Sequence, residues 1–253
     1  MTDRSSPASF EQLTSLSADA PTLIEGLPGH GLVASIAVDQ ITEQLGLTHC
    51  GNIAADEFPP VVTFEDGLVQ DLVRVYAGSD PDVMTLESDL ALPHPSFEPL
   101  SRCVLDELAD EFKRAIFLAG APAESEEAIG DVAGVGTTEA VRADLLEAEI
   151  TVPDDPGLVG GVTGSLVREC YRADVPAALL IVRAHPFLPD PQAAKAVIET
   201  ALEPLVEFDI DTTALDEQAD EIQRRMQQVA EQYQQMAQER GDEAQQKPTG
   251  MFQ

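Results

Sequence analysis

Residues 22–45 read TLIEGLPGHGLVASIAVDQITEQL, and this stretch gives the clearest indication of the fold class. Thr22 to Leu27 is a short apolar segment typical of a buried strand, and Pro28 to Gly31 is a glycine-rich loop. Leu32 to Leu45 then repeats apolar residues at helical spacing, which predicts a helix with one buried face. A strand, a glycine turn and a helix in this order open a βαβ unit.

Apolar segments and amphipathic stretches alternate along the rest of the chain. Strands are predicted at 49–54, 61–64 and 68–76 around an Asp66-Gly67 hairpin turn, then at 83–92, 114–119, 132–136, 150–152 and 177–182; helices are predicted at 97–112, 138–149, 165–172 and from Pro191 onward. The segment 177–182 is so apolar that we expect it in the centre of the sheet. The pattern predicts a three-layer α/β/α sandwich with a mixed, mostly parallel sheet and the 61–76 hairpin on one side.

The chain of 253 residues fits one such domain followed by a helical arm. We predict four parts: an irregular amino-terminal entry at 1–20, the α/β/α domain at 21–210, a heptad helix arm at 211–240 and a flexible tail at 241–253.

The arm carries apolar residues at alternating spacings of four and three, which is the a/d pattern of a coiled coil. These positions are Leu215, Ala219, Ile222, Met226, Val229, Tyr233 and Met236. Two interpretations stay open. The helix either packs its apolar stripe on the domain, as amphipathic helices usually do, or mediates self-association.

The chain is strongly acidic, with 46 acids against 14 bases and a formal charge of −32. Such a charge argues against nucleic acid or an anionic membrane as partner. Because the acids are spread over every segment, their mutual repulsion should destabilise the fold unless salt screens it. We therefore expect an acidic halophilic protein of the cytoplasm, and the absence of a long apolar run fits that location.

Cysteine and histidine do not form a recognisable metal or nucleophile pattern. Cys50, Cys103 and Cys170 are widely spaced, and so are the four histidines, His30, His49, His94 and His185. We expect no metal site, no disulfide framework, no cofactor and no catalytic residues.

A small-ligand site is the alternative function. Gly26, Gly29 and Gly31 lie where a phosphate loop could lie, at the start of a helix. Their spacing matches neither the dinucleotide fingerprint nor a P-loop. The alternative interpretation is that these glycines only permit a tight turn between strand and helix. His30 and His185 fall where the carboxyl ends of parallel strands could converge, which keeps a ligand loop open.

The last three residues, Met251, Phe252 and Gln253, place two apolar side chains at a free carboxy-terminus. Burial of both in a pocket of another protein would contribute about 1.5–3 kcal/mol each. The other reading is an accidental Met-Phe pair at a flexible end.

The run Ile24–Ala34 resembles the amino-terminal signature of the archaeal proteasome assembly chaperone family. Later landmarks are similar in order: Pro59-Pro60, the glycine-rich turn into Ser165-Leu166-Val167, the strand 178–182 and the helix start at Asp190-Pro191. The resemblance covers about residues 20–240. It implies a fold similar to that of nucleoside phosphorylases, a homo-oligomer and no enzymatic activity.

Members of this family often end in a hydrophobic residue, a tyrosine and any residue, which insert between proteasome α subunits. Met251, Phe252 and Gln253 match this pattern, except that Phe252 replaces the tyrosine. The resemblance thus implies an assembly chaperone that binds proteasome α subunits through its tail and promotes ring assembly. The alternative is a phosphorylase-like enzyme or ligand-binding protein that uses the Gly26–Gly31 loop.

Overall fold

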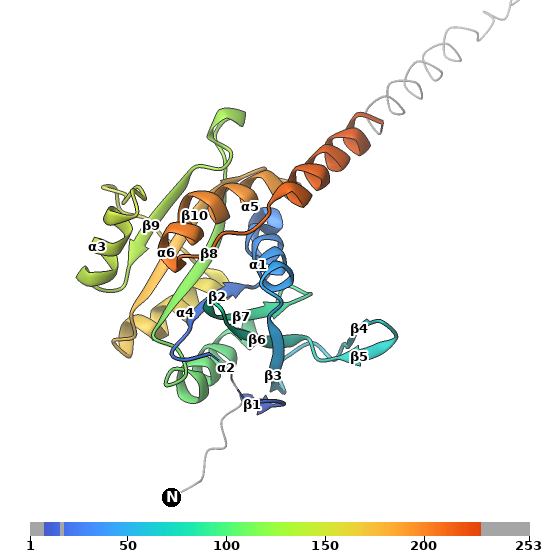
Figure 1. Cartoon of the computed structure of the whole chain (residues 1–253), viewed down its shortest axis with the longest axis vertical. Coiled ribbons are helices and arrows are strands. Elements are labelled where there is room, and N and C mark those ends of the chain that lie inside the picture. Colours follow the sequence, from blue (N-terminus) through green and yellow to red (C-terminus); the bar gives the residue numbers. More distant parts are fainter. Residues whose placement is uncertain (1–7, 16–17, 229–253) are drawn as a thin grey trace, which may run out of the picture. The chain divides into compact units, whose positions relative to one another are not determined.

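A mixed eight-stranded sheet forms the middle layer of the fold (Figure 1). The computed structural model describes residues 8–15 and 18–228. The strands lie in the order β1 (Ala8–Gln12), β3 (Thr48–Ala55), β6 (Val73–Ser79), β7 (Asp82–Ser88), β2 (Thr22–Gly26), β8 (Arg114–Pro122), β10 (Ala177–Ala184) and β9 (Val132–Gly136). Strands β2, β3, β7, β8 and β10 run in one direction, whereas β1, β6 and β9 run in the other. The predicted mixed, mostly parallel sheet is confirmed.

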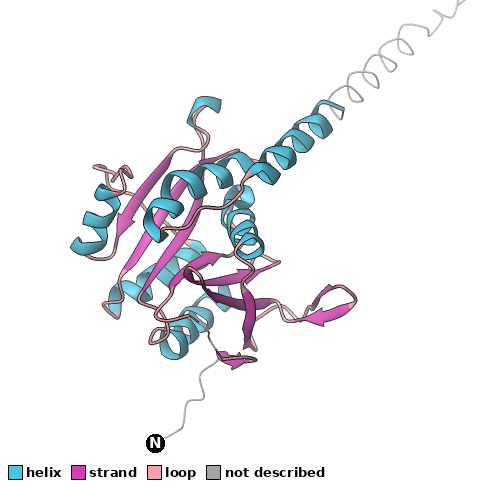
Figure 2. Ribbon diagram, in the orientation of Figure 1, coloured by secondary structure: helices cyan, strands magenta, loops and turns pink. Residues whose placement is uncertain are grey.

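Helices cover both faces of this sheet (Figure 2). They are α1 (Val33–Gln44), α2 (Phe97–Cys103), α3 (Glu139–Glu147), α4 (Gly161–Arg172), α5 (Pro191–Val197) and α6 (Glu203–Val206). Gly26 of β2 faces Val38 of α1, whereas the adjacent Glu25 bonds to Thr163 of α4. Because neighbouring strand residues point to opposite faces, α1 and α4 lie in different layers. Helix α1 packs with α5 and α2 packs with α4, which confirms the α/β/α sandwich.

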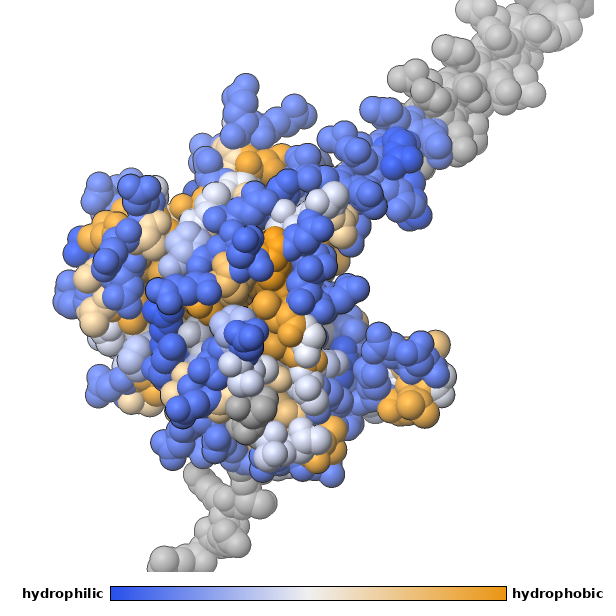
Figure 3. Space-filling view, viewed as in Figure 1, coloured by the Kyte–Doolittle hydropathy of each residue, from blue (hydrophilic) through white to orange (hydrophobic). Residues whose placement is uncertain are grey.

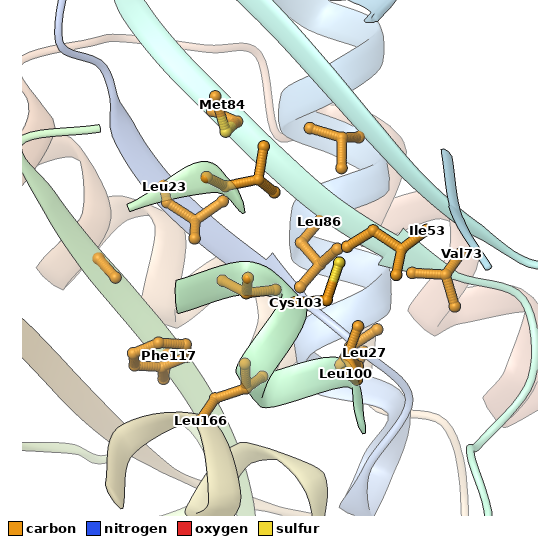
Figure 4. Packing of buried hydrophobic residues seen from close by; sticks show 14 of the residues in the cluster. Leu23, Leu27, Ile53, Val73, Met84, Leu86, Leu100, Cys103, Phe117 and Leu166 are labelled. Atoms are coloured by element: carbon orange, nitrogen blue, oxygen red, sulfur yellow. The ribbon is translucent and has the colours of Figure 1, made fainter. Parts of the chain in front are cut away.

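The main apolar core lies between the central strands and the layer of α2 and α4 (Figure 4). Leu23 of β2, Leu86 of β7 and Phe117 of β8 are fully buried there, together with Leu100 of α2 and Leu166 of α4. Full burial of such side chains contributes about 1.5–3 kcal/mol each. This packing fixes β2 and β8 side by side, and so it also fixes where the loops after them begin.

The hairpin is shorter than the predicted 61–76. Strands β4 (Thr63–Glu65) and β5 (Leu68–Gln70) form a separate two-stranded sheet. Asp66 and Gly67 between them both have positive φ, as a tight hairpin turn requires. Beyond β5 the chain leaves the hairpin, and β6 pairs with β3 and β7 in the main sheet. The apolar pattern of 68–76 predicted one continuous strand and gave no sign that the chain changes sheets within it.

Three further expectations about elements were wrong. Strand β10 lies next to the edge of the sheet, because its apolar sequence reflects cover by α4 and α5 on its two faces and not a central place. Thr151 forms a single bridge to Ala133 in place of a strand at 150–152. Helix α4 begins at Gly161, four residues before the predicted start, since a glycine with φ 73° can open a helix there.

The chain divides into two units at Thr212 and Thr213. In the second unit, residues 213–228 are helical. Four of the predicted heptad positions share one face of this helix: Leu215, Ala219, Ile222 and Met226. The remaining arm and tail positions lie outside the described residues: Val229, Tyr233, Met236, Met251, Phe252 and Gln253.

Candidate functional site

The loop after β2 approaches the ends of two other strands. It turns through a short 3-10 segment, η1 (His30–Leu32), in which Gly31 has φ 65°. A Cβ on Gly31 would lie 2.8 Å from the Cβ of Ala184 in β10. A Cβ on Gly120 of β8 would lie 2.0 Å from the backbone oxygen of His30. The two glycines therefore permit contacts of the loop with β8 and β10 that a side chain would block.

A second glycine loop reaches the same strand ends and leads into α4. Gly160 is the N-cap of this helix, and Gly161 is its first residue. No atom lies within 4 Å of the position where a Cβ on either glycine would stand, so the backbone there borders open space. The amide of Gly164 donates to the oxygen of Gly160 at 3.1 Å. The three amides before it, at 161–163, have no acceptor inside the helix.

The two loops border a cavity of about 550 Å³ at the carboxyl ends of β2, β8 and β10. These three strands are parallel neighbours. After β2 the chain crosses to β3 on one side of the sheet, whereas after β8 it continues to β9 on the other side. The cavity thus lies at a topological switch point, which is where open α/β sheets bind their ligands.

The wall of the cavity contains no acidic residue among those described, although the chain has 46 acids. The ionisable side chains in this wall are His30 and Arg183. Atom Nε2 of His30 is buried and has no hydrogen-bond partner among the described residues. Arg183 donates from Nη1 to the carbonyl of Pro122 at 3.2 Å, and its guanidinium makes no ion pair within the described part of the chain. The wall therefore combines positive charge with an unpaired ring nitrogen.

Glu25 lies in β2 behind the cavity wall and is fully buried. Its carboxyl accepts from Oγ1 of Thr163 at 3.2 Å and from the amide of Leu118 at 3.3 Å, and both of these residues line the cavity. Burial raises the pKa of Glu25 to about 8, an effect that these hydrogen bonds only partly offset. At pH 7 the side chain is therefore mostly protonated and adds little negative charge to the cavity.

The residues of the predicted ligand loop separate in the structure. Gly29 and His30 line the cavity. Gly26 lies on the other face of the sheet, where a Cβ would stand 2.6 Å from the Cβ of Val38. Gly31 permits the close contact between the loop and Ala184 of β10 that is described above.

His185 is not part of the cavity wall. Its amide donates to Oδ2 of Asp190 at 2.7 Å, and its Nδ1 accepts from the amide of Phe187 at 3.2 Å. Sequence reasoning did not select Glu25, Thr163 or Arg183. One available signal was the single acid within the apolar strand 22–26, since a charge in a buried strand marks a perturbed group.

A second cluster of buried polar side chains lies between α1 and strands β6 and β7. Arg74 donates to Oδ2 of Asp89 at 2.5 Å and to Oδ1 at 3.1 Å. These bonds hold the pKa of Asp89 below its usual range. Burial raises the pKa of Glu87 to about 7, although the hydroxyls of Thr42 and Thr85 donate to its carboxylate.

The β4–β5 hairpin exposes apolar side chains to solvent (Figure 3). Phe64 is 79% exposed, Leu68 72% and Val69 70%. Phe64 and Val69 are directly paired across the two strands, so they form one continuous patch. Exposed apolar patches of this kind mark surfaces that contact other proteins.

Other kinds of site find no support within the described residues. No group of histidine, cysteine and acidic side chains there could hold a metal ion. Burial raises the pKa of Cys50, Cys103 and Cys170 to about 11, 12 and 12, so these thiols are not activated nucleophiles. No helix in this part of the chain has both the length and the apolar character that a membrane span requires.

Comparison with known sequences gives one family and one curated relative. The sequence profile of the PAC2 family matches residues 23–230. An uncharacterized protein of Methanocaldococcus jannaschii is 28% identical over 226 residues, which cover 88% of this chain and 91% of that protein.

Comparison with solved structures gives closely similar folds. Pyrococcus furiosus PbaA, described as an archaeal homolog of proteasome-assembly chaperone, has a TM-score of 0.80 and 21% identity, covering 94% of this chain and 98% of its own. Pyrococcus furiosus PbaB, described as an archaeal proteasome activator, has a TM-score of 0.78 and 21% identity, covering 89% and 100%. The fold is therefore shared along nearly the whole length of these proteins.

Proposed function

Because the chain belongs to the PAC2 family, we propose that it is a non-enzymatic assembly chaperone for proteasomes. It binds proteasome α subunits through Met251, Phe252 and Gln253 and promotes assembly of the α ring. The observation that carries this proposal is the similarity to PbaA over 94% of this chain. The Met-Phe-Gln sequence at 251–253 supports it, because it supplies two adjacent apolar side chains.

Each tail contributes a modest binding energy. Burial of Met251 and Phe252 is worth about 1.5–3 kcal/mol each, and pairing of the terminal carboxylate with a basic group adds about 1.5–3 kcal/mol. One tail alone thus binds in the millimolar to micromolar range. Several tails on one oligomer gain about a hundredfold or more through effective concentration.

We propose that the chain forms a homo-oligomer for this reason. The heptad pattern of the arm, in which Met226 is 47% exposed, and the apolar patch of the β4–β5 hairpin support contact between copies, whereas Leu215 and Ala219 are buried within a single chain. The native mass of a chain ending at residue 212 tests the arm. A Phe64→Ser, Leu68→Ser variant tests the hairpin. If both variants retain the number of subunits found in the full-length oligomer, neither surface is required for association.

The tail is tested by removing residues 251–253 and measuring co-purification with proteasome α subunits in molar KCl. Deletion should abolish co-purification while the thermal unfolding temperature stays within about 1 °C, since a terminal tripeptide contributes little to the domain. Gln253→Ala is the matched control, because it keeps both apolar side chains and the free carboxylate. Phe252→Tyr should bind at least as tightly as the wild-type chain. Equal recovery of α subunits by the deleted and full-length chains would overturn the docking role of the tail.

A separate measurement distinguishes assembly from activation. An assembly chaperone accelerates ring formation when it is mixed with unassembled α subunits, and it leaves the peptidase activity of finished proteasomes unchanged. An activator does the reverse. The pair of readouts is needed because the similar structures include one protein described in each way.

A further inference from the structure

We propose that the cavity at the carboxyl ends of β2, β8 and β10 binds a small phosphomonoester with an apolar or aromatic body. This site lies in the α/β/α domain, and its function is separate from docking through the tail. Four observations support it: the charge of the wall, the donors at the start of α4, the side chains of His30 and Arg183, which make no ion pair within the described residues, and the apolar part of the lining.

The charge of the wall is opposite to that of the chain. Acids make up 46 of the 253 residues, yet no acid lies among the described residues of the wall. The buried acid Glu25, which is hydrogen-bonded to Thr163 of the wall, is mostly protonated at neutral pH. An anion in the cavity therefore meets no adjacent carboxylate. In a protein with a net charge of −32, this local exception favours an anionic ligand.

The start of α4 supplies donors for a phosphate group. This helix has 12 residues, and the amides of its first turn have no helical acceptor. Its positive dipole end stabilises a negative charge placed there. Gly160 and Gly161 carry no side chain and border open space, so a phosphate oxygen can approach the backbone directly.

His30, in the loop after β2, and Arg183, near the end of β10, both line the cavity. Atom Nε2 of His30 is buried and has no hydrogen-bond partner among the described residues, so a small rotation of the imidazole would present it to a ligand in the cavity. Arg183 is free of acidic partners within the described chain, and a guanidinium binds phosphate oxygens in a forked geometry. Both groups are suited to a tetrahedral oxyanion.

The rest of the lining is apolar and defines the body of the ligand. Leu92, Phe97 and Ile181 contribute carbon surface, including one aromatic ring. A volume of about 550 Å³ falls within the range of roughly 300–1,000 Å³ typical of small-molecule sites. A bare phosphate would leave this surface empty, so an ester with an organic group is the better fit.

Isothermal titration calorimetry with phenyl phosphate tests the proposal at pH 7 in 1 M KCl. Phenol and inorganic phosphate serve as the two half-ligands. We expect one saturable site per chain for phenyl phosphate, with a dissociation constant below about 1 mM, and at least tenfold weaker binding of each half-ligand. No saturable binding of phenyl phosphate up to 10 mM would overturn the proposal.

Substitutions then locate the site. Arg183→Ala and His30→Ala should each weaken phenyl phosphate at least tenfold. Arg142→Ala is the matched control, because it removes an exposed arginine on α3 away from the cavity and should not change binding. Arg183 is itself exposed, so its loss should leave the unfolding temperature unchanged and keep the test valid if His30→Ala fails to fold. Unaltered affinity in Arg183→Ala would place the ligand elsewhere and overturn the assignment.

The tail-deleted chain separates this site from the proposed chaperone role. Removal of residues 251–253 should leave phenyl phosphate affinity unchanged even where it abolishes binding to α subunits. A loss of phenyl phosphate binding on deletion of the tail would show that the cavity as described is not the binding site.

Discussion

Glu25 and Arg74 are buried ionisable residues on strands of the same sheet, but only Arg74 has an oppositely charged partner. Glu25 of β2 is fully buried and has neutral donors, among them Thr163 and the amide of Leu118. Arg74 of β6 is 6% exposed and forms a two-bond pair with Asp89. One carboxyl thus has no counter-charge, whereas the other has a guanidinium against it.

The difference appears in the pKa values. Burial raises the pKa of Glu25 to about 8, so this carboxyl is neutral below that pH. Hydrogen bonding to Arg74 lowers the pKa of Asp89, so that carboxyl stays charged. Neutral hydrogen bonds alone do not compensate the loss of hydration of a carboxylate, whereas an adjacent guanidinium does. The sheet therefore carries a neutral acid beside the ligand cavity and a charged pair towards its other edge.

Salt should have the largest effect, because it acts on the acidic surface and much less on these two interior sites. At about 1 M salt the Debye length is roughly 3 Å, compared with about 10 Å at 0.1 M. With a net charge of −32, we expect the unfolding temperature to rise by at least about 10 °C from 0.1 to 2 M KCl. Differential scanning calorimetry measures this rise. An unfolding temperature that is unchanged or lower in KCl would contradict the expected halophilic character.

Asp89→Asn should have the next largest effect, because it leaves the buried charge of Arg74 without its anion. We expect a loss of about 2–4 kcal/mol in the free energy of unfolding, the lower end reflecting the partial exposure of Asp89. Urea unfolding at pH 7 in 2 M KCl measures it. Glu98→Gln is the control, since it breaks the exposed Arg102–Glu98 pair and should cost less than about 1 kcal/mol. Equal losses in the two variants would remove the distinction between buried and exposed pairs.

Glu25→Gln should be stabilising, and its advantage should grow as the pH rises from about 4.5 to 8. The folded pKa of about 8 lies above the unfolded value of 4.5, so the unfolded chain binds fewer protons between these limits. The contribution of Glu25 to stability is therefore full below about pH 4.5 and is lost as pH rises through about 8. Glutamine resembles the neutral acid in shape and removes this loss.

We accordingly expect Glu25→Gln to match the wild-type chain at about pH 4 and to exceed it by a margin that grows between about pH 4.5 and 8 and reaches about 1–3 kcal/mol at pH 9. Thermal unfolding across this pH range measures the difference. Glu111→Gln, on an exposed glutamate, should give no pH-dependent difference. A variant that is less stable than the wild-type chain at pH 9 would mean that the ionised carboxylate is accommodated in the folded protein.

Most of the fold could be predicted from local patterns. The strand, glycine turn and helix of 22–45 appear as β2, η1 and α1 because their apolar spacing and left-handed glycine are local properties. The order of the strands in the sheet could not be read in this way. The departure of β6 from the hairpin and the place of β10 near the edge depend on pairings between residues distant in the sequence.

The candidate cavity could be predicted only in part for the same reason. His30 and Gly29 lie in the loop that the glycine pattern marked. Arg183 and Thr163 come from β10 and α4, more than 130 residues further along, and join the cavity only through the parallel pairing of β2, β8 and β10. No sequence pattern next to Arg183 or Thr163 indicates that these residues line the same cavity as His30.

Thr85→Val should have the smallest effect, and it tests Glu87, a buried carboxyl whose environment is intermediate between those of Glu25 and Asp89. Glu87 is buried like Glu25, but the hydroxyls of Thr42 and Thr85 donate to its carboxylate, and its pKa is about 7. Both hydrogen bonds lower that pKa, so loss of the Thr85 hydroxyl should raise it further. We expect a cost of about 1 kcal/mol at pH 8.5, where Glu87 is ionised, and a smaller cost at pH 5.5.

Chemical unfolding at the two pH values measures this cost, with Thr200→Val as the exposed control. If hydrogen bonds from neutral donors set how far a buried carboxyl departs from its ordinary pKa, the cost must depend on pH, because only the ionised form loses a strong acceptor interaction. A cost that is the same at both values would instead reflect altered packing around Thr85, and it would show that the Thr85 hydroxyl does not hold down the pKa of Glu87.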